Sequence, residues 1–105
     1  MADFMKILQQ AQEMQGRFQK LQEELQQQTV KASSAGGMVT VEANGQGTVK
    51  SIKIDPSIVN ASDVEMLEDL VLVAITEAQR KAGELAREEM GKLSGGLNLP
   101  FQLPF

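Results

Sequence analysis

The chain has 105 residues, of which 10 are Lys or Arg and 14 are Asp or Glu, so its formal net charge is −4. This length allows one domain with a small core, and a hydrophobic content of 42% is typical of a folded protein. His, Cys, Trp and Tyr do not occur, which excludes disulfides and the catalysis and metal binding that depend on imidazole or thiolate. We therefore expect no enzyme activity, no metal ion, cofactor or small-molecule substrate, and a location in the reducing cytoplasm.

The sequence also lacks the pattern of a targeting or membrane segment. No basic region followed by a continuous apolar stretch stands near Met1, and the longest apolar run, residues 70–75, is too short to cross a bilayer. We expect no signal peptide, no membrane span and no membrane partner.

Apolar residues near the N-terminus alternate spacings of three and four, which is the heptad pattern of an amphipathic helix. We call them the apolar seam: Phe4, Ile7, Ala11, Met14, Phe18, Leu21 and Leu25. Gln and Glu fill most other positions and no proline interrupts the pattern, so we predict one helix over residues 3–28. The seam fits packing against the rest of the same chain and a coiled-coil contact with another chain equally well.

Three short strands are predicted next, over residues 29–34, 38–43 and 48–54, because apolar and β-branched residues alternate with polar ones. Residues 35–37 and 44–47 supply the turns of an antiparallel meander. One face of this sheet is apolar and the other carries lysines, which are Lys31, Lys50 and Lys53. Residues 44–47 lack the lysine and the strand-to-helix context of a phosphate-binding loop, so they are interpreted as a simple turn.

Pro56 ends the sheet, and residues 62–65 form a capping box that predicts a second helix over residues 63–93. Residues 70–75 are apolar on every side of this helix, so we expect the sheet to cover one side and another helix the other. A stripe of small residues at every fourth position predicts close approach of the first helix, and it consists of Ala74, Ala78, Ala82 and Ala86.

Residues 1–94 thus form a single α+β domain with the order long helix, three-strand meander, long helix. Both helices are longer than the sheet, so their antiparallel pairing produces a protruding two-helix arm. A three-strand sheet with an apolar face and an open edge is poorly stable alone, so we predict a homodimer with two arms. Residues 95–105, rich in Gly, Pro, Leu and Phe, are predicted to be a flexible apolar tail suited to docking on the chain's own surface or a partner's.

The order and spacing of several segments together are specific. They are the Gln/Met/Leu-rich first helix, Gly36–Val41, Gly47–Ser57, Glu65–Ala82 and Gly95–Leu97. Across almost its whole length the chain resembles the YbaB/EbfC family of bacterial nucleoid-associated proteins. The resemblance implies a tweezer-shaped homodimer that binds duplex DNA, alters DNA conformation and contributes to nucleoid organisation and gene regulation. Met38, where relatives often extend the glycine run, affects only the shape of one loop.

The net charge opposes DNA binding, yet the charge is unevenly distributed. Residues 56–79 contain five acidic residues and no basic one, so all ten basic residues lie elsewhere. The candidates for phosphate contact lie on the two helices and are Lys6, Arg17, Lys20, Arg80, Lys81, Arg87 and Lys92. Lys31, Lys50 and Lys53 either face DNA or protect the sheet from edge pairing.

An alternative interpretation of these cations is ordinary ion pairing along exposed helix faces. The pairs at a spacing of four are Glu13–Arg17, Lys20–Glu24, Glu77–Lys81, Arg80–Glu84 and Glu88–Lys92.

We expect the dimer to grip duplex DNA in the nucleoid through phosphate contacts, with little sequence specificity and some bending. An alternative from another class is a prefoldin-like chaperone without DNA binding, whose arm tips bind unfolded chains through apolar residues such as Phe4, Met5 and Leu8 and the phenylalanines of the tail. The first function requires exposed cations on the arms, and the second requires exposed apolar side chains at their tips.

Overall fold

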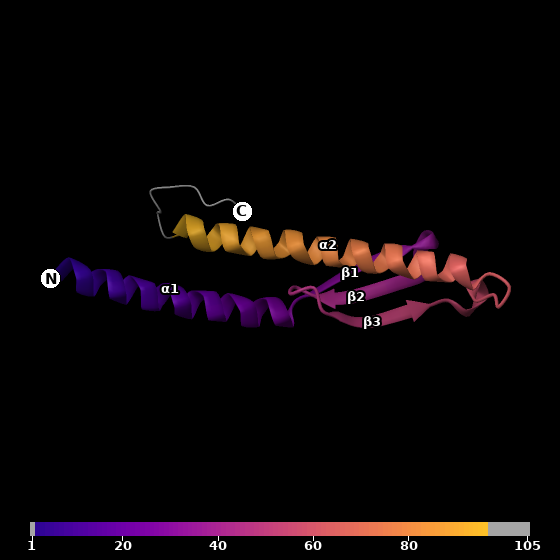
Figure 1. Cartoon of the computed structure of the whole chain (residues 1–105), viewed down its shortest axis with the longest axis horizontal. Coiled ribbons are helices and arrows are strands. Elements are labelled where there is room, and N and C mark those ends of the chain that lie inside the picture. Colours follow the sequence, from indigo (N-terminus) through magenta and orange to yellow (C-terminus); the bar gives the residue numbers. More distant parts are fainter. Residues whose placement is uncertain (1, 97–105) are drawn as a thin grey trace.

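The computed structural model describes residues 2–96, with side chains from residue 3 to residue 93. Its elements are α1 (Ala2–Gln27), β1 (Thr29–Ser34), the 3-10 turn η1 (Ala35–Gly37), β2 (Val39–Asn44), β3 (Val49–Ile54), the 3-10 turn η2 (Pro56–Ile58) and α2 (Val64–Gly96). This order confirms the predicted α+β architecture. The N-terminal end of α1 and the C-terminal end of α2 project beyond the sheet in the same direction (Figure 1), and the molecule measures 72 × 22 × 17 Å. We call these projecting parts, residues 3–24 and 84–93, the helical arm.

The sheet is an antiparallel meander in the order β1-β2-β3. Val41 of β2 lies between Ala32 of β1 and Ile52 of β3, and these positions belong to the apolar face. The opposite face carries a cross-strand ion pair of 3.2 Å between Lys31 and Glu42. The register between β2 and β3 shifts next to Ala43, where Lys50 has no partner residue on β2. This β-bulge interrupts the alternation of β3 side chains between the two faces of the sheet.

The first two residues of the alanine stripe pack on the sheet, whereas Ala86 lies beside Gln22 and Leu25 of α1, so α1 is the partner of only the last part of the stripe. Ala74 and Ala78 are fully buried in one cluster with sheet residues, which are Ala32, Val39, Val41 and Ala43. Contacts between α1 and α2 are few by comparison. A sheet and a helix both accept a face of small side chains, because such a face lets either backbone approach closely. Here the sheet covers the face at Ala74 and Ala78.

The apolar run of α2 is covered on one side only, which corrects a second expectation. Leu72 and Val73 are 62% and 56% exposed, since α1 does not reach this part of α2. The helix lies over β1 and β2 (Figure 1), so the apolar side chains of β3 also remain exposed. An open apolar groove of about 390 Å³ lies between β3 and α2, lined by Ile54, Leu67, Glu68, Val71, Leu72 and Ile75.

The ends of α2 differ slightly from prediction. Asp63, and not Ser62, caps the helix, because its Oδ1 accepts a hydrogen bond of 3.2 Å from the backbone N–H of Met66. The Ser62 N–H instead donates to Oδ1 of Asn60 at 2.9 Å, in the loop before the helix. The helix continues through Gly96, so residues 95 and 96 of the predicted tail are helical, and residues 97–105 lie outside the described part of the chain.

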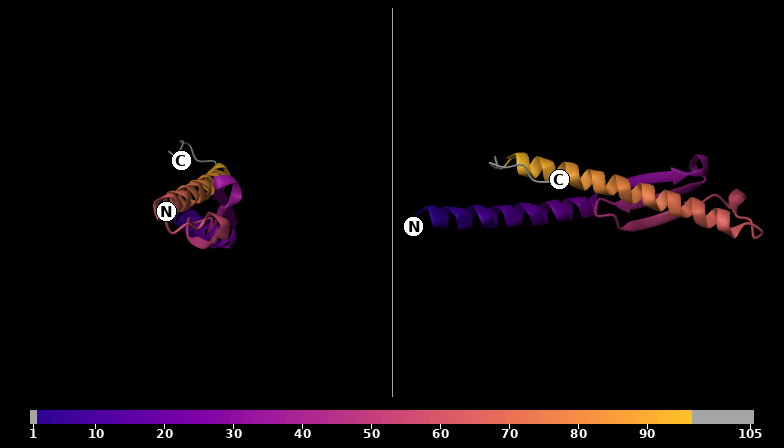
Figure 2. Two further views of the ribbon diagram at one scale, coloured as in Figure 1. Left: turned by 90° about the vertical axis from the view of Figure 1, so that its right-hand side faces the viewer. Right: turned by 45° about the horizontal axis from the view of Figure 1, so that its top comes forward.

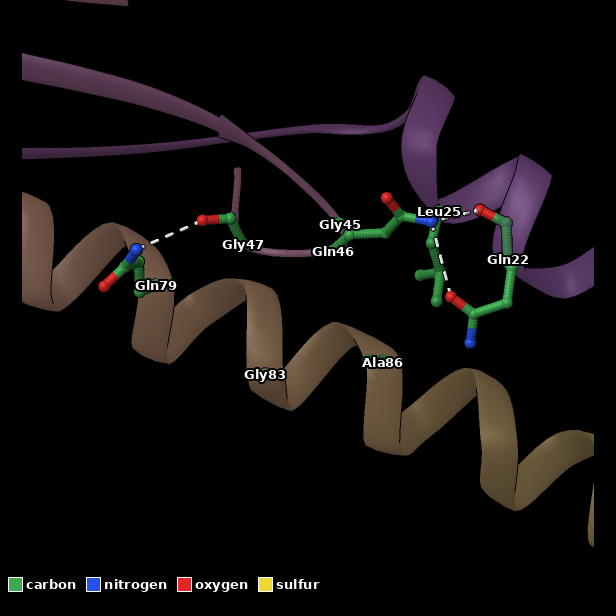
Figure 3. Close-up of a pocket in the computed structure, with 8 residues that line it drawn as sticks. All are labelled: Gln22, Leu25, Gly45, Gln46, Gly47, Gln79, Gly83 and Ala86. Carbon is green, nitrogen blue, oxygen red and sulfur yellow. Dashed lines mark hydrogen bonds between the residues drawn. The ribbon is translucent and has the colours of Figure 1, made fainter. Parts of the chain in front are cut away.

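The hairpin between β2 and β3 holds the C-terminal turns of α1. The backbone N–H of Gly45 donates to the carbonyl oxygen of Leu25 at 2.8 Å, and Nε2 of Gln46 donates to the carbonyl oxygen of Gln22 at 3.0 Å. Figure 3 shows the hairpin between α1 and α2. A Cβ at position 45 would stand 2.7 Å from the Leu25 oxygen, so only glycine permits this approach.

Buried Asn44 fixes the shape of the same hairpin. Its Oδ1 accepts hydrogen bonds from the backbone N–H groups of Gln46 and Thr48, at 2.9 and 3.0 Å. The predicted turn over residues 44–47 is therefore present, and side-chain hydrogen bonds of Asn44 stabilise it.

We predict that Gly45→Ala lowers the free energy of unfolding by about 1–3 kcal/mol, as expected when a side chain is forced into a packed site. The measurement is urea unfolding at fixed protein concentration. The matched control is Gly16→Ala in the middle of α1, where a Cβ meets nothing within 4 Å. That change should raise stability by up to about 1 kcal/mol through helix propensity. Equal effects of the two substitutions would contradict a tight Gly45 contact.

Candidate nucleic-acid interface

Three of the predicted basic residues meet in a groove between the two helices of the arm. Arg17 and Lys20 of α1 and Lys92 of α2 line a groove of about 300 Å³, together with Leu21, Glu24, Glu89 and Leu93. Helical spacing explains the grouping, because residues three, four or seven apart share a helix face. We call this site the interhelical groove.

The cations of the interhelical groove are largely available to a ligand. Lys92 makes an ion pair of 3.4 Å with Glu89, yet its side chain is 74% exposed. Arg17 and Lys20 make no ion pair within residues 3–93, so the pairs Glu13–Arg17 and Lys20–Glu24 do not form there. Lys92 pairs three residues back with Glu89 rather than with Glu88.

Arg80 and Lys81 are engaged in contacts within the chain. Arg80 binds both Glu77 and Glu84, the second as the spacing predicts. Its hydrogen bonds lower the pKa of Glu77 and raise the pKa of Arg80 itself. Nζ of Lys81 donates to the backbone carbonyl of Lys31 at 2.8 Å, so the predicted pair of Lys81 with Glu77 is not formed. Both cations thus stabilise α2 and its contact with the sheet.

The remaining predicted cations lie apart from the groove. Lys6 is exposed near the tip of α1, about 17 Å along the helix from Arg17 at 1.5 Å per residue. Arg87 is exposed one heptad after Arg80, on the side of α2 opposite the buried alanines. Lys50 and Lys53 are exposed on β3, and Lys31 pairs with Glu42.

A second hollow, which the sequence did not predict, lies where the hairpin meets both helices (Figure 3). It measures about 420 Å³ and is lined by Gln22, Leu25, Gly45, Gln46, Gly47, Gln79, Gly83 and Ala86. Nε2 of Gln79 donates to the Gly47 carbonyl at 3.1 Å. The glutamines of this hollow therefore link the hairpin to α2, and through Gln46 to α1.

Neither a metal-ligand cluster nor a membrane span is found in the described part of the chain. Within residues 2–96, no three His, Cys, Asp or Glu side chains are grouped as metal ligands, and neither helix combines the length and apolar character needed to span a membrane.

Comparison with known proteins identifies the family. The model of the YbaB/EbfC DNA-binding family matches residues 1–97. The chain belongs to this family. A nucleoid-associated protein of Gemmatimonas aurantiaca is 50% identical over 103 residues, which cover 98% of this chain and 99% of that protein. A second from Desulfotalea psychrophila is 45% identical, covering 93% of this chain and 92% of its own length. The resemblance expected from the sequence is therefore confirmed.

A solved structure shares the fold of this YbaB/EbfC family member. An uncharacterized protein of Helicobacter pylori matches with a TM-score of 0.75 and 23% sequence identity, over 83% of this chain and 91% of that one. This similarity supports the helix, sheet and helix arrangement independently of the sequence matches.

We predict that Arg80→Ala lowers the melting temperature near pH 7, because it removes the partner of two carboxylates. The pKa of Glu77 lies below its ordinary 4.5, so its contribution is present above that pH and is lost as the pH falls through the lowered value. The difference from the unsubstituted chain should therefore shrink in acid and in high salt. Arg87→Ala, on the same helix with no ion pair in residues 3–93, is the control and should show no such pH dependence.

Proposed function

We propose that the protein is a nucleoid-associated protein that binds duplex DNA as a homodimer through phosphate contacts made by its helical arms. Binding alters DNA conformation with little sequence specificity, and so contributes to nucleoid organisation and gene regulation. The observation that carries the proposal is the interhelical groove, where Arg17, Lys20 and Lys92 converge on an exposed arm of a DNA-binding family member. No catalytic step, metal ion or cofactor is part of this function.

The acidic start of α2 lies far from the cations of the interhelical groove. The acidic residues at the start of α2, which are Asp63, Glu65, Glu68 and Asp69, lie at the opposite end of the molecule from the arm (Figure 1). From Asp69 to Lys92 is about 35 Å at 1.5 Å per residue. The arm itself carries five basic and seven acidic residues. Because charges are screened beyond about 8 Å at physiological salt, phosphate contact depends on the local grouping of Arg17, Lys20 and Lys92 and not on the net charge of the arm.

The open apolar groove between β3 and α2 supports the dimer. Exposed Leu72 borders Ile54 and Val71 in this groove, and a second copy would cover this apolar surface. One arm offers only a few cations, whereas two arms double the number of phosphate contacts in one complex. Affinity then rises steeply with the number of contacts.

The comparisons favour DNA binding over the prefoldin-like alternative, since the matching family is described by DNA binding and the similar proteins as nucleoid-associated. The exposed apolar side chains at the tip of α1, on which the alternative depended, suit a contact within the chain itself equally well.

We predict that the variant K6A/R17A/K20A binds two unrelated DNA duplexes more weakly than the unsubstituted chain, by a similar factor for each. The slope of log affinity against log salt should fall by about 0.9 for each phosphate that the variant no longer neutralises. Fluorescence anisotropy at several salt concentrations measures both quantities. The variant K31A/K50A/K53A removes the same charge from the sheet and should change the slope less. An unchanged slope for the arm variant, or weakening confined to one duplex, would contradict phosphate contacts by α1.

We predict that Leu72→Glu converts the dimer to a monomer, because a carboxylate at the centre of the proposed interface loses its hydration there. Sedimentation equilibrium measures the change in mass. Met5→Glu is the control, since Met5 is similarly exposed, at 67%, but lies at the arm tip. A dimer that survives Leu72→Glu places the interface elsewhere, and weaker DNA binding by the resulting monomer would support the two-arm arrangement.

A further inference from the structure

Most of the apolar seam of α1 is uncovered by any described residue. Leu21 and Leu25 are buried against the hairpin and α2, whereas Phe4 and Ile7 are 63% and 61% exposed and Phe18 is 39% exposed. Figures 1 and 2 show that α1 continues past the end of α2, so α2 does not reach the N-terminal part of the seam. A regular apolar stripe along a free helix indicates that something covers it.

The sequence after α2 has the pattern to do so. Large apolar residues occupy every second position, and they are Leu97, Leu99, Phe101, Leu103 and Phe105. Pro100 and Pro104 stand among the intervening residues and oppose a helix. In an extended chain a period of two places all five apolar side chains on one side. In that extended conformation the segment would offer one continuous apolar edge to a partner surface.

Its starting point and length match the uncovered seam. The helix α2 ends at Gly96, one turn after Leu93, which lines the interhelical groove beside Arg17 and Leu21. Nine extended residues reach about 30 Å at 3.3 Å each. The seam from Phe18 to Phe4 is about 21 Å long at 1.5 Å per residue of helix.

The other large apolar surface is beyond this reach. Leu72 in the groove between β3 and α2 is about 36 Å from Gly96 along the straight helix, at 1.5 Å per residue. A segment of about 30 Å anchored at Gly96 cannot extend to it. Of the two exposed apolar surfaces, the seam is therefore the one that the chain's own C-terminal segment can cover.

We propose that residues 97–105 dock along the apolar seam of α1 in the same chain, between Phe18 and Phe4, and so complete the helical arm. The cations of α1 stay accessible, because Arg17 is about 100° around the helix from Phe18. Docking of residues 97–105 therefore neither requires nor prevents the proposed DNA binding. The experiments that test docking involve no DNA. Phe101 and Phe105 supply the largest contacts of the segment.

The absence of cysteine from the chain permits a single spin label at Gln102→Cys, a polar position of the segment. We expect strong broadening of the nuclear magnetic resonance signals of residues 4–11 in the full-length protein, and none at Leu72 or Val73. The same label at Asn60→Cys, in the loop before α2, is the control and should leave residues 4–11 unaffected. Unbroadened signals over residues 4–11, or broadening centred on Leu72, would overturn the proposal.

A second variant separates docking from chance proximity. In F101S/F105S, carrying the same label, the broadening over residues 4–11 should disappear and the amide hydrogens of α1 should exchange faster. Asn98→Ser, a polar change in the same segment, should alter neither. Broadening that persists in F101S/F105S would mean that the label is near the seam by chance. Seam amides whose exchange is unchanged would mean that another surface, such as a second copy, covers the seam. Either result would overturn the proposal.

A mixed sample tests whether docking is within one chain. Spin-labelled protein without isotope is combined with isotope-labelled protein without spin label, after exchange of subunits. Docking within the chain predicts no broadening of residues 4–11 in this mixture, because label and signal then reside on different chains. Broadening of undiminished strength would assign the segment to a neighbouring copy and overturn the proposal.

Discussion

The direction of the helical arm depends on the close approach of two backbone segments, Gly45 in the hairpin and Leu25 near the end of α1. Only Gln28 separates α1 from β1, and a linker of one residue does not by itself fix an angle. The hydrogen bond between the Gly45 N–H and the Leu25 carbonyl, with the buried side chains of Leu21 and Leu25, fixes the last turns of the helix. Since α1 otherwise touches α2 only sparsely, every cation on α1 takes its position from this junction.

The second constraint is that one helix is too narrow to cover three strands spaced about 4.8 Å apart. Because α2 packs on β1 and β2 through its alanines, Ile52 and Ile54 of β3 stay exposed beside Leu72. The arrangement that buries the core efficiently is thus the same one that leaves an apolar surface for association. The burial of the core and the exposure of this apolar surface are consequences of a single packing arrangement.

Periodicity was sufficient to predict the helices and strands to within a few residues, because each element repeats its apolar positions at the spacing of its own backbone geometry. It did not decide which surface each apolar face meets, since the alanine stripe suits a sheet and a helix equally. The same limit applies to the cations. Arg17 and Lys20 share a face by spacing alone, whereas the contact of Lys81 with the Lys31 carbonyl joins residues fifty apart and depends on where α2 crosses β1. No local pattern encodes that crossing.

The contact of Lys81 with Lys31 also affects how copies of this chain assemble. An open strand edge offers its carbonyl and N–H groups to the edge of another sheet, which allows sheets to join into fibres of unlimited length. On β1 one of these carbonyls is already occupied by an ammonium group, which a neighbouring strand would have to displace. The contact of Lys81 therefore opposes the addition of a further strand at β1. This opposition matters because the remaining exposed apolar surface favours self-association.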